Sequence, residues 1–217
     1  MRLSRSSRWF VVSGLVVAPI AGSAATLHAQ VNFDIGPLVA YYRPLGHFDP
    51  VPVLSSALPN TPSDLSAVAW GGEARVSFGR RWGAGAQLAF TQSKVPQVIT
   101  PAGRRGPTGG QVLTASVQAE YDVSPRPTKY QLWLSAGPGL VRHGGDAYER
   151  YGSPTDVAGV LGMDFTFPIA SHLRFAVGAT TLLYSIDVKE RSESPVSLER
   201  GFQTDALVHV GVRWGAP

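Results

Sequence analysis

The chain has 217 residues and a formal net charge of +4, and only 16% of its residues are charged. This length allows one domain. With 24 glycines and so few charged residues, the chain has fewer charges than the surface of a water-soluble protein of this size normally carries. The absence of cysteine excludes a disulfide scaffold, a thiolate metal site and a cysteine nucleophile.

Residues 1–29 have the pattern of a secretory signal peptide. Three arginines precede an apolar run at residues 9–20, and small residues follow it. The run is too short for a convincing membrane-spanning helix. We expect cleavage after Ala29, with Ala25 as the alternative site, and a mature domain at residues 30–217. Either cut lowers the formal charge to +1, from 16 basic against 15 acidic residues, and leaves no basic patch that would indicate nucleic-acid binding.

The mature chain contains eight segments in which apolar and polar residues alternate with a period of two. Such alternation predicts strands with one apolar face, because a helix would scatter the apolar residues around its circumference. The segments have about the length of a tilted strand that crosses a bilayer. In chain order they are residues 31–41, 70–78, 82–90, 113–122, 130–140, 157–167, 173–184 and 206–214.

The connections between these segments alternate between long and short. Long connections cover residues 43–66, 92–110, 143–154 and 187–201, whereas tight turns are expected at residues 79–81, 124–128 and 168–172. This alternation is typical of an outer-membrane barrel with long extracellular loops and short periplasmic turns. The sequence therefore predicts an all-β fold, an eight-stranded antiparallel up-and-down transmembrane β-barrel.

Aromatic residues near the short turns agree with this topology. An interfacial aromatic girdle is expected where barrel strands leave the membrane. The girdle residues would be Phe33, Phe78, Trp82, Tyr121, Tyr130, Phe167, Phe175 and Trp214.

Alternation alone does not distinguish a membrane barrel from a soluble barrel that buries its apolar face. The lysines favour the membrane: Lys94, Lys129 and Lys189 are all expected in connections, whereas a water-exposed sheet face would carry several. Pro37 and Pro138 lie inside predicted strands and cannot donate to a ladder, so we expect a bulge or an early strand end at each.

The alternating segments at both ends of the mature chain, with the Gly137-Pro138-Gly139 segment between them, resemble the small outer-membrane β-barrel proteins of the OmpA/OmpX type. The resemblance covers residues 30–214 and concerns architecture. It implies insertion into the outer membrane with the help of the barrel-assembly machinery, contact with outer-membrane lipid, and variable functions carried by the loops. A monomer is expected.

Charged residues on the polar faces are expected to form a network inside the barrel. Asp164 and Arg174 would be direct cross-strand neighbours if the hairpin turned at Ile169, and Asp34 and Arg213 would pair where the first and last strands meet. The predicted interior network comprises Asp34, Glu73, Arg75, Glu120, Asp164, Arg174, Asp205, His209 and Arg213.

The sequence gives little support for a catalytic site. Asp205 and His209 share an inward face and could form a hydrolytic site with Ser135 or Ser116, but an interior hydrogen-bond network is the favoured interpretation. His143 is expected in a surface loop, or less readily as a base facing lipid headgroups. We expect no catalytic, cofactor or metal site.

Three functions remain open. The favoured one is a non-enzymatic outer-membrane protein whose loops serve adhesion, envelope stability or the binding of an external ligand. The second is a passive conduit for small apolar molecules, similar to the OmpW barrels, with a lateral opening near Pro37 or Pro138. The third is a lipid-modifying barrel enzyme. A wide, water-filled porin is excluded by the strand number.

Overall fold

The computed structural model describes residues 31–45, 66–79, 81–95, 98–100, 103–105, 108–125, 129–145, 148, 154–189 and 198–215. Residues 1–29, the predicted signal peptide, lie outside this part of the chain. No helix among the described residues is long and apolar enough to span a membrane.

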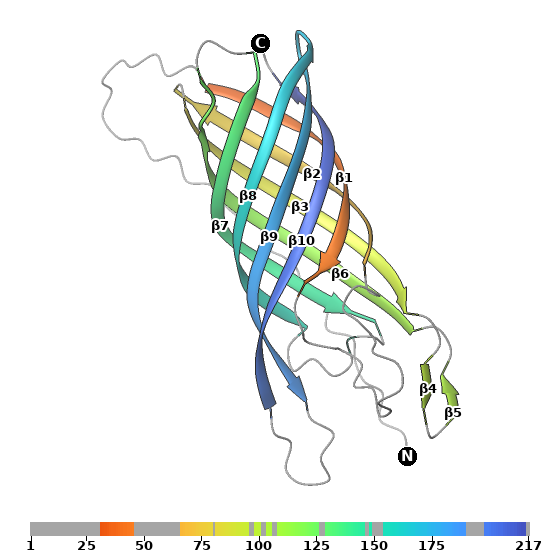
Figure 1. Ribbon diagram of the computed structural model, residues 1–217. Coiled ribbons are helices and arrows are strands. Elements are labelled where there is room, and N and C mark those ends of the chain that lie inside the picture. The colour runs from red at the N-terminus through yellow and green to blue at the C-terminus, as the bar shows by residue number, and fades with distance from the viewer. Residues whose placement is uncertain are drawn as a thin grey trace, which may run out of the picture.

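Eight antiparallel strands close into a barrel (Figure 1), which confirms the predicted fold. Going round the ring, the order is β1-β10-β9-β8-β7-β6-β3-β2, so strands adjacent along the chain pair with each other and β1 pairs with β10. The strands are β1 (Val31–Pro44), β2 (Ala67–Phe78), β3 (Trp82–Val95), β6 (Thr108–Asp122), β7 (Gln131–Gly144), β8 (Thr155–Ala170), β9 (Leu173–Lys189) and β10 (Leu198–Gly215).

The strands are longer than predicted at the end of the barrel that carries the long connections. β9 and β10 project furthest beyond the ring and shorten the connection that was expected at residues 187–201 (Figure 1). A small hairpin of β4 (Val98–Thr100) and β5 (Gly103–Arg105), which was not predicted, lies beyond β3 and β6. Lys94 is the second-last residue of β3, and Lys189 is the last residue of β9. The expectation that all three lysines lie in connections is therefore wrong for these two.

The short-turn end is built from tight hairpins. In the β2–β3 turn, Gly79 has a φ of 67°, a conformation that glycine adopts without steric cost. The β8–β9 hairpin turns at Ser171 and His172, with a register shift between Pro168 and Ala170. Strand β8 therefore continues to Ala170, through the first three residues of the turn that was expected at residues 168–172.

The two prolines inside strands cause neither a bulge nor an early end, so that prediction is wrong. The β1–β10 register is the same on both sides of Gly36 and Pro37, and the β6–β7 register is the same on both sides of Gly137 and Pro138. At each site two residue pairs of the ladder are missing on one side of the strand: Gly36 and Pro37 lack partners on β10, and Gly137 and Pro138 lack partners on β6. Their pairing on the other side, with β2 and β8, is intact. A Cβ at residue 36 would collide with the carbonyl oxygen of Val212, so glycine allows the two backbones to stay close where proline provides no N–H.

The outer surface of the ring is apolar. Outward side chains in the middle of the strands are aliphatic, among them Val117, Leu134, Leu161 and Val210. Aromatic side chains lie toward both ends: Trp82 packs against Tyr121 and Phe167 against Phe175 at the short-turn end, whereas Trp70 and Phe202 are exposed nearer the long connections. An apolar band with aromatic borders is the surface that a transmembrane barrel presents to lipid.

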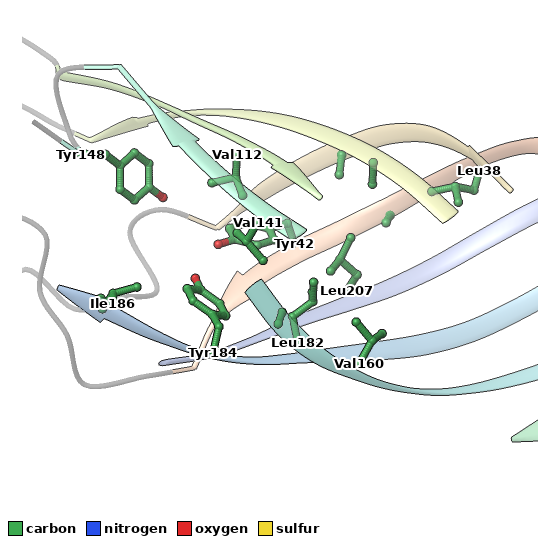
Figure 2. Packing of buried hydrophobic residues seen from close by; sticks show 14 residues of the cluster. Leu38, Tyr42, Val112, Val141, Tyr148, Val160, Leu182, Tyr184, Ile186 and Leu207 are labelled. Atoms are coloured by element: carbon green, nitrogen blue, oxygen red, sulfur yellow. The ribbon is translucent and has the colours of Figure 1, made fainter. Parts of the chain in front are cut away.

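The interior contains an apolar layer that the alternation pattern did not predict. Figure 2 shows the buried cluster, in which Leu38, Val160 and Leu207 lie on the short-turn side of Tyr42 and Tyr184, whereas Ile186 lies on the other side of Tyr184. Burial of these side chains, together with alanines from neighbouring strands, leaves this part of the barrel packed like a protein core. Its larger members are Leu38, Val141, Val160, Leu182 and Leu207, whereas Val112 and Ile186 lie at or beyond the level of the tyrosines.

We predict that Val117→Arg destabilises the membrane-inserted barrel. Val117 is 60% exposed on the outer face near the middle of β6, where an arginine costs about 2–4 kcal/mol in lipid. Urea unfolding in phospholipid vesicles, followed by tryptophan fluorescence, measures the loss.

The matched control is Val157→Arg. Val157 is equally apolar and even more exposed, but it lies near the start of β8 at the long-connection end, where the cost falls to about 0–1 kcal/mol. Equal losses for the two variants would show that the band does not contact lipid.

Candidate functional site

Four strands place six charged or titratable side chains inside the barrel near its short-turn half. Successive side chains of a strand point to opposite faces, so residues two apart on β2 and four apart on β10 point inward together. Each of these residues is at least nine-tenths buried. They are Glu73 and Arg75 of β2, Glu120 of β6, Asp164 of β8, and His209 and Arg213 of β10.

Arg75 joins two carboxylates from other strands. Its guanidinium forms a bidentate pair with Glu120, through Nε to Oε2 and through Nη2 to Oε1 at 3.0 Å. Nη2 also donates to Asp164 Oδ2 at 3.1 Å. The guanidinium carbon lies 4.7 Å from the centre of the Trp133 ring, so an aromatic face covers the cation.

Arg213 holds the second pair of carboxylates. Nε and Nη2 each donate to Glu73 at 2.6 Å, and Nη2 lies 3.3 Å from Asp164 Oδ1. His209 Nε2 lies 2.8 Å from the same Asp164 oxygen. Asp164 is therefore the centre of the network, because it contacts both arginines and the histidine.

Small residues make room for these side chains. A Cβ at residue 178 would collide with the Asp164 carboxylate and lie 2.6 Å from His209 Nε2. A Cβ at residue 85 would collide with Glu120. A cavity of about 20 Å³ remains beside the network, which is room for about one water molecule.

The pairing of buried charges determines whether this interior is stable. An unpaired ion in the interior costs several kcal/mol, and bidentate arginine–carboxylate geometry offsets that cost. Glu73, Asp164 and His209 offer ligand atoms within 4.8 Å of one another, a spacing that could suit a metal ion. Arg213 already donates to Glu73 and forms an ion pair with Asp164, and so supplies the positive charge that a metal would bring.

Both predicted ion pairs are wrong, although all four residues belong to inward faces. Asp164 is opposite Gly178 and Arg174 is opposite Pro168, because the hairpin turns at Ser171 and His172 rather than at Ile169. Arg174 instead donates to Gln131 Oε1 at 2.9 Å and lies 3.7 Å from Asp34 Oδ2. Asp34 therefore lies beside Arg174, while Arg213 pairs with Glu73.

A second cluster lies beyond the apolar layer, toward the long connections. Asp205, which is fully buried, accepts hydrogen bonds from Tyr42 at 2.7 Å, Tyr184 at 2.6 Å and Gln203 at 2.9 Å. In Figure 2 the hydroxyl groups of Tyr42 and Tyr184 point toward each other across the lumen. This arrangement surrounds one carboxylate with three donors from three strands.

Two further residues extend this cluster toward the mouth of the barrel. His143 is buried, with Nε2 3.1 Å from the Tyr184 hydroxyl and Nδ1 3.6 Å from Asp156 Oδ2. Tyr148, from the connection after β7, packs against the His143 ring and is hydrogen-bonded to Tyr42. Burial, with the nearby Asp205 carboxylate, raises the pKa of the Tyr148 phenol well above its usual range.

The placement of His143 corrects the expectation of a surface-loop or lipid-facing histidine. β7 continues to Gly144, and His143 is in phase with the inward residues Trp133 and Ser135. Continuing the alternation beyond Leu140 would have revealed this. Tyr148 carries no such signal, because it lies outside any strand.

The residues proposed for a hydrolytic site do not come together. Asp205 binds tyrosines in one cluster and His209 binds Asp164 in the other. Ser135 and Ser116 both hydrogen-bond to the Gln118 side chain. The geometry therefore contains two structural clusters, separated by the apolar layer, rather than a serine with a histidine base.

No protein-family model matches the sequence, and no curated protein shows significant sequence similarity to it. Among solved structures, the chain is similar to the outer membrane protein OprG from Pseudomonas aeruginosa, with a TM-score of 0.60 at 12% identity over 87% of this chain and 97% of OprG. It is also similar to the E. coli outer membrane protein W, with a TM-score of 0.49 at 11% identity over 87% of this chain and 99% of that one. The OprG comparison confirms the predicted resemblance to small outer-membrane barrels at the level of the fold.

We predict that Arg213→Met strongly destabilises the barrel. The substitution keeps much of the side-chain volume but leaves Glu73 without its bidentate partner and Asp164 with one cation fewer, a loss of about 3–5 kcal/mol. Unfolding in urea, read from the gel mobility of unheated samples, measures this loss. Arg81→Met, which removes an exposed arginine from the β2–β3 turn, is the control and should unfold like the wild type.

We also predict that Tyr42→Phe and Tyr184→Phe each destabilise the barrel by about 1–3 kcal/mol, because each leaves the buried Asp205 with one donor fewer. The double variant should lose less than the sum of the two single losses, since both hydroxyls bond to the same oxygen. Strict additivity in the same unfolding assay would show that the two tyrosines act independently of Asp205.

Proposed function

We propose that this chain is an integral outer-membrane protein whose barrel is a closed, non-enzymatic anchor and whose function lies in the connections at its long-loop end. Those connections would serve adhesion, envelope stability or the binding of an external ligand. The observation that carries the proposal is the filled interior. The ion-pair network, the apolar layer and the tyrosine cluster succeed one another along the axis of the barrel.

A filled interior argues against transport of water-soluble solutes. Eight-stranded barrels are just wide enough for side chains to fill, and here charged side chains pair with each other across the lumen. The exposed apolar band supports contact with outer-membrane lipid, and the closed ring has no strand edge for another copy to join. We therefore propose a monomer that inserts with the help of the barrel-assembly machinery.

A second candidate is a passive route for small apolar molecules. It is favoured by one observation: the β1–β10 ladder is interrupted at Gly36 and Pro37, next to Leu38 of the interior apolar layer. Such a route would lead from the apolar layer through the wall of the barrel into the membrane. The close packing of the layer and the burial of Tyr148 above it favour the closed anchor.

A lipid-modifying enzyme has less support. Such an enzyme needs a nucleophile and a base that reach the membrane surface. Among the described residues, His143 and His209 face the interior, and His172 lies in the β8–β9 turn, where its side chain has no hydrogen-bond partner among those residues.

The absence of cysteine gives a direct test of orientation. A cysteine introduced as Ser63→Cys, in the first long connection, should react with a membrane-impermeant maleimide on intact cells. His172→Cys, in the β8–β9 turn, should react only after the outer membrane is permeabilised. The opposite labelling pattern would overturn the proposed orientation.

Conductance and dye uptake separate the anchor from the conduit. In planar bilayers the wild-type protein should give no conductance steps of porin size, and vesicles that contain it should take up a small apolar dye no faster than protein-free vesicles. Faster uptake that Leu38→Trp abolishes would establish the conduit in place of the anchor.

A further inference from the structure

A hollow of about 120 Å³ lies at the short-turn end of the barrel, where β7, β8 and β9 meet. The register shift between Pro168 and Ala170 lies beside it, and such irregularities bend a strand and open local space. Its volume exceeds what one or two water molecules need. The lining residues are Lys129, Gln131, Thr166, Phe167, Pro168 and Arg174.

Most polar groups that line this hollow are cations or hydrogen-bond donors. Lys129 is exposed at its edge, and Arg174 is partly exposed in its wall. Among the described residues, Arg174 contacts Gln131 and Asp34 through Nη1, so Nε and Nη2 remain as donors. The described residues that line the hollow include two cations and no carboxylate, and Asp34 contacts Arg174 from outside this lining, so the hollow has a net positive charge.

Thr166 adds an independent indication of a ligand. Its side chain is 2% exposed, and its hydroxyl has no hydrogen-bond partner among the described residues. Leaving a buried hydroxyl unsatisfied is unfavourable, and such groups in folded proteins usually have a partner. A hydrogen-bond acceptor held in the hollow would satisfy it.

We propose that this hollow binds a phosphate group. A tetrahedral oxyanion presents several acceptors to donors arranged around it, which suits an arginine, a lysine and a threonine hydroxyl better than a planar carboxylate or a cation would. Lys129 is next to Tyr130, which is exposed and stacks on Phe165 at the aromatic border. The hollow is thus at the height where aromatic residues meet lipid headgroups.

The phosphate has two possible sources: the phosphodiester of a phospholipid in the inner leaflet, or soluble phosphate from the adjacent compartment. The lipid source rests on the membrane location proposed above, whereas binding of inorganic phosphate does not. The test therefore treats the two probes separately.

The experiment titrates the folded full-length mature barrel in octyl glucoside, a detergent without phosphate. The probes are inorganic phosphate, dihexanoyl phosphatidylglycerol and, as a chain-matched control without phosphate, dihexanoylglycerol. Binding is measured by calorimetry. We expect at least one phosphate probe to bind and dihexanoylglycerol not to bind; binding of phosphatidylglycerol alone assigns the site to a lipid, and binding of inorganic phosphate to a soluble ligand.

Three variants make the result specific to the hollow. Thr166→Val should weaken binding about tenfold by removing a hydrogen bond to a charged group, without lowering stability in urea, since the hydroxyl has no hydrogen-bond partner among the described residues. Lys129→Gln should also weaken binding. Arg81→Gln removes a cation from another turn at the same end and should bind like the wild type.

Absence of binding to both phosphate probes overturns the proposal. Weakening by Arg81→Gln equal to that by Lys129→Gln also overturns it, because binding would then be a general effect of positive charge. A loss of stability in Thr166→Val would show that the hydroxyl is satisfied within the protein. None of these outcomes affects the labelling test of membrane orientation, so the two proposals can fail independently.

Discussion

The fold depends on one constraint: a backbone that crosses lipid must satisfy every N–H and C=O group within the protein. The pairing of β1 with β10 meets this constraint by joining the first and last of the described strands. Once the ring is closed, each strand has one face toward lipid and one toward the lumen. The apolar band outside and the buried charges inside both follow from that division.

The lumen imposes a second requirement, because charges inside it are screened little by water and must pair with each other. Asp164 meets both arginines and His209, and its neighbour across the hairpin is Gly178, which leaves the necessary space. At the other end Asp205 is stabilised by neutral donors instead of cations. The interior is thus divided into a zone of ion pairs and a zone of hydroxyl hydrogen bonds, separated by apolar side chains.

Sequence patterns predicted the strands and their faces, because a period of two is a local property of the chain. Register is not local: Asp164 was assigned to Arg174 by assuming a turn at Ile169, and the real turn at Ser171 and His172 places Gly178 there. The inward position of His143 could have been read from the phase of β7. The burial of Tyr148 and the β4–β5 hairpin could not, since neither continues an alternating strand.

The contacts of the network join strands that are not hydrogen-bonded neighbours, which also explains why no hairpin pattern reveals them. Arg213 of β10 reaches Glu73 of β2 across β1, and Arg75 of β2 reaches Glu120 of β6 across β3. His209 of β10 meets Asp164 of β8 across β9. Arg75 of β2 also reaches Asp164 of β8, which is four strands away in either direction round the ring, and this contact can form only when the sheet has closed. The ion pairs therefore favour the closed ring over a flat sheet, and closure in turn shields them from water.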